Sequence, residues 1–217
     1  MKRIVIAVAG VTTLGLGIFM SDPASAYVLL SPTRIWEVRP VAVEVCTVKD
    51  ETSIAAPDLD FGQTATKNAL NSVNGWNGPQ PGLVNAFLSA NHYDLGDGVS
   101  TLTFNDPLNI CTGSCLAATL TGYYSFDGGL GIYVIDDADI MVTKKNNIKF
   151  DSEIEKPPGT CSAAYYVEGI MVHEMGHVLG LGHSATSTAT MYSTVGTCNS
   201  GLDEIDTDDI NGINFLY

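Results

Sequence analysis

Basic residues are scarce in this sequence. Lys and Arg together number 10, against 24 Asp and Glu in 217 residues, and the formal net charge is -14 at pH 7. A surface with this balance repels nucleic acid and anionic membranes, so we expect neither as a partner. Internal repeats, low-complexity tracts and Gly/Ser linkers are also absent. Because 45% of the residues are hydrophobic, the chain can bury one good core, and we expect a single domain.

Long hydrophobic runs are missing except at the N-terminus. There Lys2 and Arg3 precede seventeen uncharged residues, 4–20, and residues 24–26 have the small-x-small pattern of a signal peptidase site. We therefore predict a signal peptide over residues 1–26 and a mature domain over residues 27–217. The mature protein would be secreted, extracellular or periplasmic, with no membrane contact after cleavage. The alternative is an uncleaved anchor, which the shortness of the run and its Gly and Thr residues disfavour.

Cysteine is infrequent too, and all five cysteines follow the predicted cleavage site, which fits an oxidising compartment. Their spacing suggests that Cys111 and Cys115 clip a short loop. It also suggests that Cys161 and Cys198 join, which would stabilise the fold by about 4 kcal/mol through loop entropy. Other pairings of five cysteines remain possible. Cys46 is left over, and we expect a buried structural thiol.

Only four histidines are present, and three of them lie in one HExxHxxGxxH string over residues 173–183. On a helix, His173 and His177 project from one face and can bind the same Zn²⁺. Glu174 lies beside them, where a carboxylate can take a proton from water. Gly180 can end the helix and return His183 as a third ligand. The fourth position then stays open, as in a catalytic zinc site, unless the string arose by chance or binds metal without catalysis.

Hydrophobic periodicity predicts several strands and three helices along the mature chain. The expected strands cover residues 34–48, 83–90, 99–104, 116–124 and 132–142. The expected helices cover residues 60–76, 161–179 and 206–217. This order of elements predicts an α+β, or mixed α/β, domain.

Several motifs together resemble the matrixin branch of the metzincin zinc peptidases. They are the zinc string, Ser184 directly after it, the tripeptide Thr190-Met191-Tyr192, and the last helix with its sequence 208–213. The resemblance implies a twisted, mostly parallel sheet with an antiparallel edge strand, an active-site helix and a C-terminal helix. It also implies a Met-turn, in which Met191 would form a hydrophobic floor under the zinc.

The resemblance further implies a zinc endopeptidase that acts on protein or peptide substrates. With the predicted signal peptide, we expect this enzyme to be secreted, and we expect it to be a monomer. A substrate strand would lie antiparallel to residues 116–123, and Glu174 would act as general base for the attacking water. Gly169 would lie at the floor of the main side-chain pocket, with Tyr192 beside it, and a large apolar residue would fit there. The alternatives are a secreted zinc-binding protein without turnover and a zinc hydrolase of a non-peptide amide.

Departures from the family concern its other metals and its latency. A structural zinc needs histidines that this chain lacks, because Leu116-Ala117-Ala118 stands where one would occur and only His92 remains elsewhere. The Cys111–Cys115 clip is a candidate substitute brace. Calcium is possible at the acidic segments 127–131 and 136–139, which are otherwise solvent-facing turns. We expect no cysteine-switch propeptide.

Overall fold

The structure is a computed structural model that describes residues 7–8, 27–47, 59–90, 94, 96–125, 131–143, 147–153 and 159–217. Within these ranges, seven strands form one sheet and two short strands form a second. The strands of the main sheet are β1 (Ala7–Val8), β2 (Arg34–Ile35), β3 (Val41–Cys46), β4 (Val84–Ser89), β5 (Thr101–Thr103), β6 (Ala117–Ser125) and β7 (Tyr133–Val142). The small sheet pairs β8 (Phe150–Asp151) with β9 (Tyr165–Tyr166), and the helices are α1 (Leu59–Leu70), α2 (Val167–Val178) and α3 (Thr207–Leu216).

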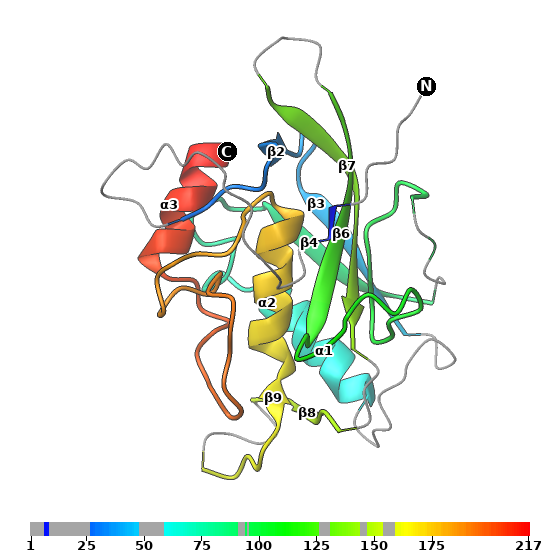
Figure 1. Ribbon diagram of the computed structural model, residues 1–217, viewed down its shortest axis with the longest axis vertical. Helices are drawn as coiled ribbons and strands as arrows, with labels where there is room; N and C mark the ends of the chain where they lie inside the picture. The colour runs from blue at the N-terminus through cyan, green and yellow to red at the C-terminus, as the bar shows by residue number, and fades with distance from the viewer. Residues whose placement is uncertain are drawn as a thin grey trace.

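The main sheet is mostly parallel. Its order is β1-β6-β7-β5-β3-β4, with β2 paired to β7 beside this path. Strands β4, β3, β5 and β7 run parallel to one another, whereas β6 runs antiparallel to β7 (Figure 1). The outer edge of β6 pairs antiparallel with β1, where Val8 lies opposite Leu120. The fold is therefore the expected mixed α/β fold with an antiparallel strand at one side of a parallel sheet.

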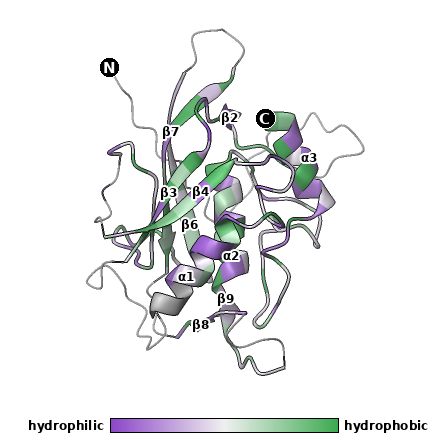
Figure 2. Ribbon diagram, turned by 180° about the vertical axis from the view of Figure 1, so that it is seen from behind, coloured by the Kyte–Doolittle hydropathy of each residue, from purple (hydrophilic) through white to green (hydrophobic). Residues whose placement is uncertain are grey.

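The core lies between the sheet and the helices α1 and α2, which contact each other. Strands β3 and β4 carry hydrophobic stretches, as Figure 2 shows. Trp76 is fully buried in this core, and its Nε1 donates to the Val172 carbonyl in α2 at 2.8 Å. The indole thus joins the loop after α1 to the middle of α2, which fixes the helix over the sheet.

The predicted helix over residues 161–179 is wrong at its start, because α2 begins at Val167. Residue Ala163 has a φ of 52°, which interrupts a helix, and Cys161 is tied to Cys198. Residues 165–166 instead form β9. The chain therefore enters α2 from a strand rather than from an earlier helical turn.

Two other predicted elements were too long. The helix predicted over residues 60–76 ends at Leu70, because the Asn71 side chain bonds both the N–H and the carbonyl of Ala86 in β4. The strand predicted over residues 34–48 is divided into β2 and β3, and Pro40, which has no N–H for a ladder, precedes β3. The final helix is confirmed, with Asp206 as its N-cap.

Both predicted disulfides, Cys111–Cys115 and Cys161–Cys198, are present. Cys46 is buried and lies outside both bridges. Apart from Ala7–Val8, the predicted signal segment lies outside the described residues, as do His92 and residues 127–130. No helix within the described part of the chain is long and apolar enough to cross a membrane.

Candidate metal centre and substrate cleft

The three histidines of the string converge on one point. A ligand nitrogen from each of His173, His177 and His183 lies within 4.8 Å of the other two. The Nε2 atoms of His177 and His183 are 3.2 Å apart. No other group of three His, Cys, Asp or Glu side chains in the described residues comes together in this way. The geometry fits a tridentate imidazole site of the kind that zinc prefers.

Backbone carbonyls orient two of the rings. Nδ1 of His173 lies 2.6 Å from the Thr190 carbonyl, and Nδ1 of His177 lies 2.8 Å from the Leu181 carbonyl. Because a carbonyl can only accept, each Nδ1 carries the hydrogen and each Nε2 keeps its lone pair. The two carbonyl contacts therefore direct both Nε2 atoms toward the common centre.

Burial keeps the imidazoles neutral, which is the form that binds a metal. It lowers the pKa of His173 to about 4, although the bond to Thr190 opposes the shift. The pKa of His177 is lowered well below its usual value by burial and by the other two histidines. Burial also lowers the pKa of His183. The three side chains thus present ligand lone pairs, not positive charges, at neutral pH.

Gly180 returns the chain to the centre after α2. Its φ is 101°, and a Cβ at this position would lie 2.3 Å from the Arg34 carbonyl oxygen. The next residues pair with the N-terminal segment, since Gly182 donates to the Val28 carbonyl at 2.7 Å. A side chain at Gly180 would therefore push away the segment that holds His183 in place.

Met191 lies beneath α2, where its side chain fills the space next to Gly176. It is 2% exposed. Its backbone is held from α3, because the Asp209 carboxylate accepts from the N–H groups of Thr190 at 2.8 Å and Met191 at 3.1 Å. Asp209 was not identified from the sequence, although it lies in the helix that resembles the matrixin one.

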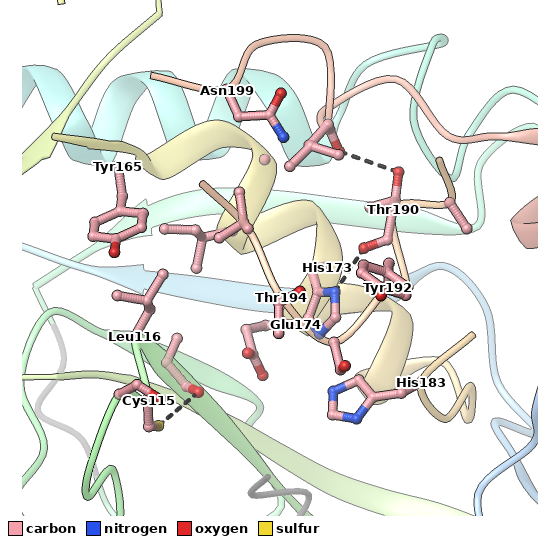
Figure 3. A pocket seen from close by; sticks show the side chains of 18 of the residues that line it. Cys115, Leu116, Tyr165, His173, Glu174, His183, Thr190, Tyr192, Thr194 and Asn199 are labelled. Carbon is pink, nitrogen blue, oxygen red and sulfur yellow. Dashed lines mark hydrogen bonds between the residues drawn. The ribbon is translucent and has the colours of Figure 1, made fainter. Parts of the chain in front are cut away.

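Glu174 is 5% exposed and lines the same cleft as His173 and His183 (Figure 3). Thr119 in β6 donates a hydrogen bond to Glu174 Oε2 at 2.6 Å. Burial raises the pKa of Glu174 to about 7, and the bond from Thr119 opposes part of that rise. Thr119 was missed in the sequence, because nothing in its local pattern points to a residue 55 positions later.

The cleft next to the histidines has a volume of about 230 Å³ and contains both predicted pocket residues, Gly169 and Tyr192. Its walls come from the start of β6, from α2 and from the segment after the histidine string. Gly169 leaves room for another residue, because a Cβ there would lie 2.7 Å from Leu202 Cβ. Leu202 also lines the cleft. Leu202 could not be found from the sequence, because it lies 33 residues away from Gly169 and no local pattern links the two.

Comparison with known proteins agrees with this geometry. Residues 116–217 match the matrixin peptidase family. The chain is 40% identical over 98 residues to metalloendoproteinase 1 of Glycine max, a match that covers 43% of this chain and 31% of that protein. It is 45% identical over 56 residues to metalloendoproteinase 2-MMP of Arabidopsis thaliana, covering 26% and 15%. For human matrilysin the identity is 47% over 45 residues, covering 21% and 17%.

The matches thus span less than a third of the length of each of these relatives. The family match, over residues 116–217, includes the segment that forms the histidine centre, the Met191 turn and α3. The family match and these relatives together support a matrixin-like metzincin catalytic domain in this chain.

Proposed function

We propose that this protein is a secreted zinc-dependent endopeptidase with Glu174 as its general base. The observation that carries the proposal is the convergence of three imidazoles next to the buried Glu174 carboxylate, which lines the same cleft as His173 and His183. His173, His177 and His183 would hold the zinc ion, which supplies a Lewis acid that polarises the scissile carbonyl and favours deprotonation of water. Glu174 takes the proton from the attacking water and passes it to the leaving amine.

The outer edge of β6 is the proposed binding site for the peptide substrate. In the structure, β1 already pairs antiparallel with this edge, at Leu120 and Thr121. An extended peptide can make the same backbone hydrogen bonds. Since β1 falls within the predicted signal peptide, cleavage after Ala26 would expose this edge in the mature protein.

The cleft beside Gly169 and Tyr192 is the proposed pocket for the substrate side chain that follows the scissile bond. Leu202 packs over Gly169 and, in our proposal, sets the depth of this pocket. We expect a preference for a large apolar residue, because apolar surface leaves water on binding. A cleavage profile that prefers Gly or Ala at this position would contradict the assignment.

The predicted leader and the two disulfides support the proposed secretion. We propose residues 27–217 as the mature protein and a monomer as its state. N-terminal sequencing of the secreted protein should find Tyr27 first, and light scattering should give the mass of one chain. An uncleaved N-terminus in the active protein would contradict the proposed leader.

We also propose a calcium site at Asp137 and Asp139 in β7, whose carboxylates would bind the ion. Asp137 Oδ1 and Asp139 Oδ2 are buried and have no hydrogen-bond partner within the described residues. Burial raises the pKa of Asp139 to about 7, and burial with nearby Asp97 raises that of Asp137 to about 6. Oxygen ligands of this type suit Ca²⁺. Calcium should raise the melting temperature of the wild type at pH 8 but not that of Asp139→Asn, and equal shifts in both would reject the site.

The central experiment is hydrolysis of a quenched fluorescent peptide library, with zinc quantified in the same samples. The wild type should bind one zinc and cleave, and a chelator should stop cleavage. Glu174→Gln keeps the shape of the side chain but removes the base, so it should bind zinc and lose nearly all turnover, about 100-fold or more. Zinc binding without cleavage in the wild type, or full activity in the variant, would reject the proposed function.

A further inference from the structure

The hydroxyl group of Thr119 is the one side-chain donor that contacts the Glu174 carboxylate among the hydrogen bonds of the described residues. We propose that Thr119 is a positioning residue, which holds Glu174 with one carboxylate oxygen turned toward the sheet and the other toward the cleft. The inference rests on the proposed function, because it assigns a partner to the general base of that reaction. Thr119 itself touches neither the substrate nor the metal in this proposal.

The contact favours the carboxylate over the other acceptor in reach. Thr119 Oγ1 lies 2.6 Å from Glu174 Oε2 and 3.2 Å from the Glu174 backbone carbonyl oxygen. A hydroxyl has one hydrogen, and bonds from a hydroxyl to a carboxylate are both shorter and stronger than bonds to a neutral carbonyl. The backbone carbonyl also lies inside α2, where helical N–H groups serve the carbonyls. The hydrogen is therefore assigned to Oε2.

The position of Thr119 explains how the bond reaches the active site. Thr119 is 2% exposed, and its backbone is paired with Ile140 in β7, so the hydroxyl is carried by a rigid strand. Strand β6 packs against α2, which carries Glu174. The hydroxyl is not needed for the strand itself, because Val has at least as good a preference for a sheet as Thr.

The hydrogen bond from Thr119 gives the two carboxylate oxygens of Glu174 different roles. Oε2 accepts from Thr119, whose hydrogen stays on its own oxygen throughout. Oε1 is left to accept the proton from the attacking water, and that proton then goes to the leaving amine nitrogen as the carbon–nitrogen bond breaks. Without the hydroxyl, the three-torsion side chain of Glu174 would sample other rotamers, and fewer of them would place Oε1 correctly.

Thr119→Val tests the inference, because it keeps the shape of the side chain and removes the donor. Loss of a hydrogen bond to a charged group predicts a kcat about 10-fold to 100-fold below the wild type. KM and zinc content should stay within about 2-fold, because the substrate strand and the histidines are untouched. Thr119→Ser, which restores a hydroxyl, should recover most of kcat.

Thr143→Val is the matched control. Its hydroxyl is also buried but has no hydrogen-bond partner in the described part of the chain, and it does not contact Glu174. Its kcat should equal that of the wild type. If Thr119→Val does not fold, Thr119→Ala supplies the same comparison against Thr119→Ser, with the melting temperature of each variant recorded.

A kcat for Thr119→Val within about 2-fold of the wild type would overturn the inference, as would a rise in KM with kcat unchanged. Failure of Thr119→Ser to recover kcat would overturn it as well. These outcomes are distinct from failure of the proposed function, which would appear as absence of cleavage by the wild type or full activity of Glu174→Gln.

Discussion

Replacing Gly176 by Ala should loosen the packing of Met191 beneath the proposed metal centre. A Cβ on Gly176 would lie 2.2 Å from Met191 Sδ and 2.8 Å from a ring carbon of Trp76. The indole cannot retreat, since Trp76 is fully buried and its Nε1 bonds the Val172 carbonyl at 2.8 Å. Met191 must therefore move by about 1.5 Å to reach an ordinary contact distance.

Two opposing effects decide the size of the change. Ala in a helix interior is more favourable than Gly by about 1 kcal/mol, because Gly loses more backbone entropy. Overpacking a well-filled core costs about 1–3 kcal/mol. Since the contacts are with buried groups, we expect the overpacking to dominate and the free energy of unfolding to fall by about 1–2 kcal/mol.

The metal should be affected through the same displacement. Thr190, next to Met191, provides the carbonyl that orients His173. Disturbing a group that hydrogen-bonds a metal-binding histidine lowers metal affinity by about 10-fold or more. Zinc affinity can be measured by competition with a chromophoric chelator.

Urea unfolding, followed by tryptophan fluorescence after removal of zinc, measures the stability effect without the contribution of bound metal. Gly196→Ala is the matched control, because a Cβ there meets nothing within 4 Å and its φ is not in the positive range. It should be neutral or slightly stabilising. A Gly176→Ala protein that is more stable than the wild type, with unchanged zinc affinity, would refute the reasoning.

Two further predictions concern buried polar groups. The Thr66 hydroxyl in α1 is buried and has no hydrogen-bond partner in the described residues. Thr66→Val should therefore stabilise the protein by about 1 kcal/mol and raise its melting temperature by about 2–4 °C. An unchanged or lower melting temperature would show that the hydroxyl does have a hydrogen-bond partner. Because the pKa of Asp139 is raised to about 7 in the folded protein, folding is favoured below its unfolded pKa of about 4 and that contribution is lost as the pH rises toward 7. In calcium-free buffer, the stability of Asp139→Asn relative to the wild type should therefore rise between about pH 4 and 7 and stay constant above pH 7. Urea titrations at several pH values measure this difference in the free energy of unfolding. A difference that does not vary with pH would count against the raised pKa.

Features that depend on local spacing could be predicted from the sequence. The separation of His173 and His177 places both on one face of a helix whatever the rest of the chain does. Gly180 tolerates the positive φ that the turn requires, and Asp206 caps the final helix through its own side chain. The short interval between Cys111 and Cys115 allowed their bridge to be inferred as well.

The ends of helices and strands were harder to predict from the sequence, because long-range contacts determine them. The helix after residue 161 was extended too far toward the N-terminus, since its apolar residues continue into a segment that the Cys161–Cys198 bridge and β9 hold in another conformation. The first helix was extended beyond Leu70, where the Asn71 side chain bonds β4 instead. Hydrophobic periodicity along the sequence cannot detect either of these long-range contacts.

By itself the sequence predicted the candidate ligand set, the candidate base and the fold class, because each follows from residue types at fixed short spacings or from motifs that resemble a family. Only the tertiary structure decided which groups complete the site. Thr119 reaches Glu174, Asp209 holds the backbone of Met191, and Leu202 occupies the space above Gly169. These partners lie on separate elements and meet only when the sheet, α2 and α3 pack together. Because they are far apart in the sequence, local spacing does not reveal the contacts between them.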